Sequence, residues 1–155
     1  MRQKTYSDIR PEKGYDIENV ENGKCTVLFF DNIEEESQEI PNVENEETTT
    51  NIMYSYDLYV LKVTYRENLA EEIERNLENW LNKAKEEDYN EVAVEIRKKR
   101  DELLASTDWT QMADTALSKA KQNAYKTYRQ ALRDVPEQPG FPYEVEFPVL
   151  EQAGE

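Results

Sequence analysis

The sequence predicts an α+β fold, in which a small antiparallel β-sheet or hairpin precedes about three α-helices and an extended, proline-rich C-terminal arm. Three observations predict it. Residues 25–30 and 52–65 are rich in β-branched and aromatic side chains. Residues 69–105 and 115–134 carry apolar side chains at three- and four-residue steps. Four of the six prolines lie in residues 136–148, where they disfavour helix.

Composition divides the chain into three regions. We predict a β-rich region over residues 1–67, a helical region over 68–135 and an extended arm over 136–155. At 155 residues the chain suits one compact domain with a small appendage. Its 37% hydrophobic content includes 16 aromatic residues, which bury large areas, so a modest core is expected.

The N-terminal region contains two segments without a clear apolar pattern. Residues 1–23 are polar and interrupted by Pro11, Gly14 and Gly23, and we expect an irregular arm with at most one short extended piece. Residues 31–50 hold eight acidic residues and no basic one, which predicts a long mobile loop. Such a loop would connect the strands at 25–30 and 52–65.

The strand at 52–65 changes its apolar face along its length. Ile52, Tyr54, Tyr56 and Leu58 alternate on one side, and the apolar residues after Leu58 include Leu61, Val63 and Tyr65 on the other. This change predicts either a bulge around residues 59–61 or burial on both faces. Because two strands alone are marginal in water, a third strand or a helix should cover them.

Three helices follow in the predicted order. The first begins after a capping Asn68 and ends near Lys85, and the second spans residues 89–105. The basic cluster at 97–100 interrupts the second apolar stripe and is interpreted as a solvated face. The third helix spans residues 115–134 and is stopped by Pro136.

Charge and targeting features exclude some functions and locations. The net charge is -15, from 19 basic and 34 acidic residues, and this excess repels nucleic acid and anionic membranes. We therefore expect neither as a partner. The N-terminus lacks the apolar core of a secretory signal, and no run is long enough to cross a bilayer. These features predict a soluble protein used inside a cell.

The sequence offers little for catalysis. Histidine is absent, and with only four glycines there is no phosphate-binding loop. The single Cys25 lies in an apolar strand pattern, which favours a buried, inert thiol over a nucleophile. The acidic segment lacks the glycine of a calcium loop. We predict a non-enzymatic protein without metal or cofactor.

The remaining candidates are aromatic side chains suited to protein binding. Trp109 in a polar turn is either a lid over the helical core or an exposed anchor. In the arm, aromatic and aliphatic residues alternate with proline and glutamate from residue 141 to 148, forming a strip with one apolar side. The predicted partner-binding residues are Trp109, Tyr125, Tyr128, Arg129, Phe141, Tyr143 and Phe147.

The strip must dock on some surface. It either folds back onto the protein's own sheet or adds an edge strand to a partner. The sequence leaves both arrangements open.

Three motifs occur in order between residues 97 and 148. They are Arg-Asp-Glu-Leu-Leu at 100–104, Ser-Thr-Asp-Trp-Thr-Gln at 106–111 and Tyr-Arg-Gln-Ala-Leu-Arg-Asp at 128–134, followed by Pro-Glu-Gln-Pro-Gly-Phe-Pro. With this order, the segment resembles the phage tail assembly chaperone family. Residues 1–67 carry no comparable resemblance.

The resemblance implies a role and a partner. The chain is expected to be a non-enzymatic phage or prophage tail assembly chaperone, which helps a tail fibre or receptor-binding subunit fold, trimerise or attach. It would act in the host bacterial cytoplasm, and homo-oligomers are compatible with this role. The alternative is a structural component of the tail, tail fibre or baseplate that is retained in the virion.

Overall fold

A computed structural model describes residues 3–41 and 48–150, and the chain forms two compact units. The N-terminal unit is Met1–Asp88 and the C-terminal unit is Tyr89–Glu155. The observed architecture is a four-stranded antiparallel sheet followed by helices, which confirms the predicted α+β class. The three-part division by composition is a different partition, and it stays a prediction.

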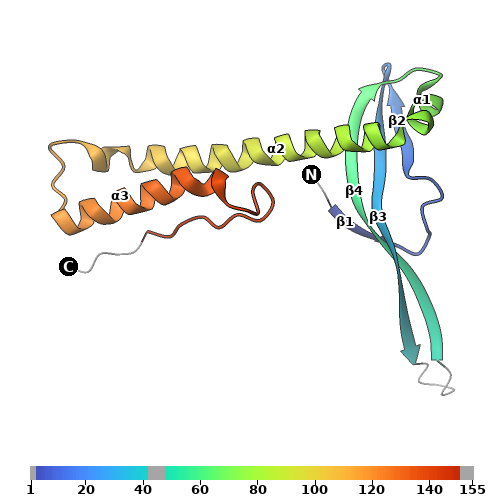
Figure 1. Ribbon diagram of the computed structural model, residues 1–155, viewed down its shortest axis with the longest axis horizontal. Coiled ribbons are helices and arrows are strands. Elements are labelled where there is room, and N and C mark those ends of the chain that lie inside the picture. Colours follow the sequence, from blue (N-terminus) through green and yellow to red (C-terminus); the bar gives the residue numbers. More distant parts are fainter. Residues whose placement is uncertain (1–2, 42–47, 151–155) are drawn as a thin grey trace. The chain divides into compact units, whose positions relative to one another are not determined.

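The N-terminal unit is built on one sheet with the strand order β1-β4-β3-β2 (Figure 1). The two central strands are long: β3 is Lys24–Pro41 and β4 is Thr48–Thr64. The edge strands are shorter, with β1 at Gln3–Ser7 and β2 at Tyr15–Glu21. All neighbouring pairs are antiparallel.

The expectation of an irregular N-terminal arm is wrong, because both edge strands lie in it. β1 pairs with β4, and β2 pairs with β3 through a two-residue turn at Asn22-Gly23. Both turn residues have positive φ, 50° and 73°, as a type I′ hairpin requires. The central strands supply backbone partners to residues whose own side chains are largely polar, so an apolar pattern alone misses them.

The expectation of a loop over residues 31–50 is also wrong where the structure describes it. Strand pairing continues from Glu34 opposite Ser55 to Pro41 opposite Thr48. Glu34, Glu35 and Glu36 are exposed on this ribbon, so their charges remain hydrated. Residues 42–47 lie outside the described residues, and the predicted mobility there is untested.

The change of apolar face in β4 coincides with burial on both sides of the strand. Adjacent Ser55, Tyr56 and Asp57 are all buried. The register shift lies in β3, between Asp31 and Glu34, and not at residues 59–61 of β4. There Asn32 adopts a φ of 51° and donates from Nδ2 to Asp57 Oδ2 at 2.8 Å. Asparagine tolerates this conformation better than most residues, which accounts for the site of the irregularity.

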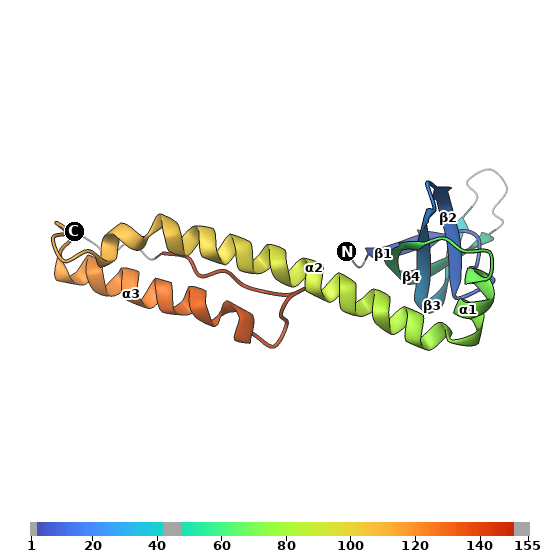
Figure 2. The same cartoon turned by 90° about the horizontal axis from the view of Figure 1, so that it is seen from above.

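Helices cover one face of the sheet (Figure 2). α1 is Leu69–Arg75, and α2 is Leu77–Ser106 with its first residues in this unit. Their side chains close a core with alternate residues of β2, β3 and β4, which share a face because side chains alternate along a strand. The buried core comprises Tyr15, Cys25, Val27, Phe29, Tyr59, Leu61, Leu69, Ile73 and Ala84. Cys25 is buried as predicted, and desolvation raises the pKa of its thiol.

Glu74 of α1 ties this helix to β2. Its Oε1 accepts from Lys13 Nζ at 2.6 Å and from the Tyr15 hydroxyl at 3.1 Å. The hydrogen bond from Lys13, and then that from Tyr15, lower the pKa of Glu74 below its usual value.

This contact predicts a pH-dependent effect of Glu74→Gln. A carboxylate with a lowered folded-state pKa contributes stability above its unfolded pKa, and the contribution is lost as pH falls through the folded value. We expect Glu74→Gln to lower the urea midpoint at pH 7 and to have little effect once the carboxylate of the wild type is protonated. Urea melts from pH 7 to pH 3 measure this. Glu71→Gln, on the same helix, is the control, and equal pH dependence in both variants would contradict the assignment.

The helix boundaries differ from those predicted. The break lies at Asn76, and α2 then continues for 30 residues through the polar stretch at 86–88, where we expected a gap. Asn68 precedes α1 without accepting a capping bond; its Nδ2 donates to Glu72 Oε1 at 2.8 Å instead. The stretch at 86–88 contains only helix-compatible residues, so polarity alone did not end the helix.

The C-terminal unit contains the rest of α2 and three further elements. They are the 3₁₀ turn η1 at Asp108–Gln111, the helix α3 at Lys119–Asp134 and the 3₁₀ turn η2 at Val135–Glu137. α3 begins four residues later than predicted, because Ser118 accepts a capping bond from the Lys121 amide at 3.3 Å. The remaining described residues form turns and then extended backbone that runs beside α2 and α3 (Figures 1 and 2).

Candidate partner-binding surface

Trp109 lies on the surface of the C-terminal unit. Its side chain is 51% exposed, and its ring meets that of Tyr125 edge-on, with centroids 5.9 Å apart. Met112, just beyond η1, is also exposed. Of the two predicted positions for Trp109, the exposed one is observed. The contact joins η1 to α3 and leaves about half of the Trp109 side chain exposed.

The structure places Tyr128 and Arg129 differently from Trp109. Tyr128 is half-buried, and Arg129 is buried at 7% exposure within the C-terminal unit. Arg129 Nη2 contacts Asp108 Oδ1 at 2.6 Å, so its charge is neutralised internally. A direct contact of Arg129 with a partner stays a prediction, and the observed position gives the residue an internal role.

The arm packs on helices. Phe141 lies 6.2 Å from the Tyr89 ring, and Tyr143 lies 6.3 Å from the same ring, both edge-on. Tyr89 and Tyr143 are 40% and 42% exposed, so this three-ring cluster borders solvent. The described arm forms no β-strand, so the predicted pairing with the protein's own sheet is not seen, and the addition of a strand to a partner stays a prediction. Tyr89 is a member of the surface that the sequence analysis missed.

The basic cluster of α2 contacts the arm. The Arg97 guanidinium lies 5.0 Å from the Phe141 ring centroid, and Lys99 Nζ lies 4.4 Å from that of Phe147. Cations over aromatic faces are attracted by about 0.5–1 kcal/mol at exposed sites. Both basic side chains remain exposed, as predicted. Two of the basic residues that interrupt the apolar stripe at 97–100 therefore contact aromatic rings of the arm, which the sequence did not reveal.

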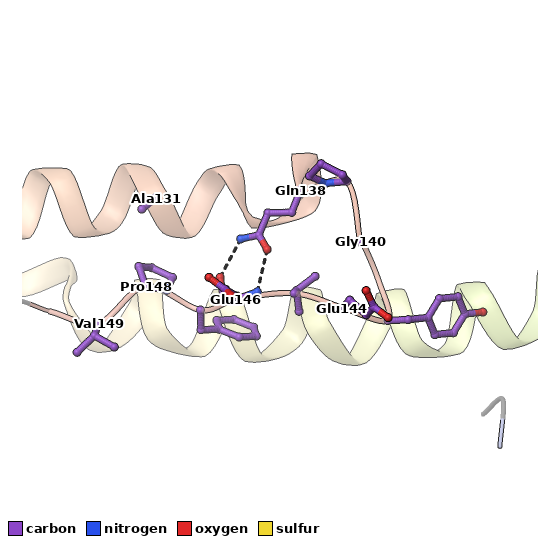
Figure 3. A pocket seen from close by; sticks show the side chains of 11 residues that line it. Ala131, Gln138, Gly140, Glu144, Glu146, Pro148 and Val149 are labelled. Carbon is purple, nitrogen blue, oxygen red and sulfur yellow. Dashed lines mark hydrogen bonds between the residues drawn. The ribbon is translucent and has the colours of Figure 1, made fainter. Parts of the chain in front are cut away.

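Gln138 links the beginning of the arm to Glu146. Its Nε2 donates to the Glu146 carbonyl, and its Oε1 accepts from the Glu146 amide, both at 2.8 Å (Figure 3). The Gln138 side chain thereby bonds both the amide and the carbonyl of Glu146, as a neighbouring strand would in a sheet. An open groove of about 780 Å³ borders this link, between Ala131 of α3 and residues 138–149. The groove walls are formed largely by the arm itself.

The chemistry of these residues suits binding. Within residues 3–41 and 48–150, no group of three or more histidine, cysteine or acidic side chains is arranged to hold a metal. In the same described ranges, no helix has the length and apolar character that crossing a bilayer requires. The described surface of the C-terminal unit exposes aromatic rings, and aromatic residues are enriched in protein interfaces.

Most of the C-terminal unit is similar to a known protein family. Residues 93–150 match the model of the family described as phage tail assembly chaperone protein. The predicted resemblance is confirmed for this segment. No curated protein and no solved structure matches the chain.

The chaperone match coincides with the C-terminal unit. It begins within α2 and ends with the arm, so it includes η1, α3 and every predicted binding residue. Tyr89 lies just before the matched segment. The match supports a general role in phage tail assembly, and chaperone-type families of this kind are generally non-enzymatic. The sheet of the N-terminal unit lies outside the match.

Proposed function

We propose that this protein is a non-enzymatic chaperone that binds a tail fibre or receptor-binding subunit during phage tail assembly. The proposal is supported mainly by one observation: the family match covers most of a compact unit, and this unit exposes aromatic side chains. A chaperone must present apolar surface while staying soluble. The net charge of -15 favours solubility of such a complex.

The proposed contact residues are the exposed Trp109 and Tyr143 and the half-buried Tyr125 of the predicted set, joined by the exposed Tyr89. Trp109 with Tyr125 forms one part, and Tyr89 with Tyr143 forms another. Phe141 and Phe147 hold the arm in place through their contacts with α2. The host bacterial cytoplasm is the proposed location, because fibre subunits are synthesised there before assembly.

Co-expression with the tail fibre subunit of the same phage tests the proposal. We expect the chaperone to raise the soluble and trimeric fibre yield. Trp109→Ala should weaken binding by about 2 kcal/mol, the usual effect of truncating a central aromatic anchor. Val20→Ala removes an exposed apolar side chain from the N-terminal unit and serves as the control. Unchanged fibre solubility and trimer yield without the chaperone would refute the proposal.

A retained structural component of the tail, fibre or baseplate is the second candidate. It is favoured by the N-terminal unit, whose long β3–β4 ribbon lies outside the chaperone match. Mass spectrometry of purified particles separates the two functions. Stoichiometric copies in particles indicate a structural component, whereas a chaperone should be absent.

A further inference from the structure

Arg129 links α3 to the segment in which α2 ends and η1 begins. Its Nη1 donates to the Leu104 carbonyl at 2.5 Å and to Thr107 Oγ1 at 2.7 Å. Its Nη2 donates to Asp108 Oδ1 at 2.6 Å. All three acceptors lie within five consecutive residues, directly before Trp109.

The Leu104 carbonyl also accepts from the Thr107 amide at 3.1 Å and from Thr107 Oγ1 at 3.0 Å, and Arg129 adds a charged donor from α3. The last carbonyls of a helix have no partner within it, and a cation near the C-terminus is favourable. The planar guanidinium can bond several acceptors at once, which an ammonium cannot do with the same geometry. Arg129 therefore fixes both the last turn of α2 and the side chain of Asp108.

The contacts of Arg129 lie directly beside Trp109. Tyr125 lies one helical turn before Arg129 on α3, so both side chains lie on the same face of that helix. Arg129 holds the residue before Trp109, and Tyr125 meets the indole ring itself. One face of α3 thus holds the Asp108 side chain of η1 and supplies the ring next to Trp109.

We propose that Arg129 is a positioning residue, which holds Trp109 in its binding orientation before the partner arrives. The inference rests on the proposed function, because it assigns a role to a buried residue of the same surface. An anchor that is already ordered loses less conformational entropy on binding, which strengthens the complex. The Nε of Arg129 is buried and forms no hydrogen bond with the described residues. In this orientation Nη1 and Nη2 of the guanidinium form hydrogen bonds, whereas Nε forms none with the described residues.

The test uses Trp109 as its own reporter. The chain has two tryptophans, so Trp80→Phe leaves Trp109 as the only one. In this background we compare Arg129→Met with Arg133→Met, which removes an exposed arginine one turn later on α3. Fluorescence anisotropy and near-ultraviolet circular dichroism of Trp109 are measured in the free protein, and far-ultraviolet dichroism monitors helix content. Affinity for the purified fibre subunit is measured separately.

We expect Arg129→Met to lower the anisotropy of Trp109 and to weaken fibre binding by about tenfold, while helix content is retained. Arg133→Met should change neither quantity, and Arg129→Lys should recover part of the loss. If Arg129→Met does not fold, Thr107→Val removes one acceptor and should lower the anisotropy by a smaller amount.

Two results would overturn the inference. An unchanged Trp109 anisotropy in folded Arg129→Met would show that the arginine does not hold the indole. A lower anisotropy with unchanged affinity would show that the orientation does not matter for binding. If Trp109→Ala also leaves the affinity unchanged, the proposed binding surface itself is wrong. This failure can be told apart from a failure of the Arg129 inference, because the anisotropy of Trp109 is measured without a partner.

Discussion

Phe29→Ala is expected to lower the free energy of unfolding of the N-terminal unit by about 3–5 kcal/mol. Phe29 is fully buried on β3, which is one of the two central strands of the sheet. Its ring fills the space between the sheet and the two helices that cover it, together with Leu61 and Ile73. Truncation removes the transfer free energy of the ring and leaves a cavity that the surrounding strands cannot fully close.

Phe30→Ala is the matched control for this prediction. Phe30 is the next residue of β3 and therefore points to the opposite face, where it is half-buried and meets Tyr56 edge-on at 5.1 Å. We expect a clearly smaller loss of stability. Urea unfolding followed by circular dichroism measures both variants. Equal losses would contradict the assignment of the helix-covered face as the main core.

Gly140→Ala is expected to release the arm from its turn and to destabilise the C-terminal unit by about 1–3 kcal/mol. A Cβ at this position would overlap the Glu144 carbonyl oxygen and lie 2.8 Å from Glu144 Cβ. The Glu144 amide also donates to the Gly140 carbonyl at 2.7 Å, so the two backbones cannot separate without breaking this bond. The turn places Phe141 against Tyr89, and its loss should free that ring.

Amide hydrogen exchange of residues 138–150 measures the effect on the arm. Glu144→Ala is the control, because it shortens the exposed side chain and leaves the carbonyl in place. We expect faster exchange in Gly140→Ala alone, with the sheet of the N-terminal unit unchanged. If amide exchange in the arm stays slow in Gly140→Ala, the close approach of Gly140 to Glu144 is not needed to hold the arm.

The strongest predictions from sequence concerned elements with a clear apolar period. The strand at 52–65 and the three helical stripes supplied the α+β class, because burial of one face fixes such elements. The edge strands were missed because their polar side chains follow no such period. The Asn22-Gly23 dipeptide was the available signal for β2, since it favours a two-residue hairpin.

The surroundings of the candidate binding residues could be predicted only in part. For Trp109 the sequence left a lid over the helical core and an exposed anchor open; the side chain is exposed, and its part in binding stays a prediction. Tyr89 was missed, since its two ring contacts come from residues more than 50 positions away. The buried position of Arg129 was equally hidden, because its acceptors lie on another helix and on η1.

By itself, the amino-acid sequence determined the fold class, the helical stripes and the resemblance of the C-terminal segment to tail assembly chaperones. These properties depend on local periodicity and on ordered motifs, both of which can be read along one chain. The tertiary structure alone decided that β3 extends into the acidic segment as far as Pro41, that α2 passes residues 86–88 unbroken and that the arm packs on Arg97 and Lys99. Each of these features depends on a partner distant in sequence, whose backbone or ring supplies the stabilising contact.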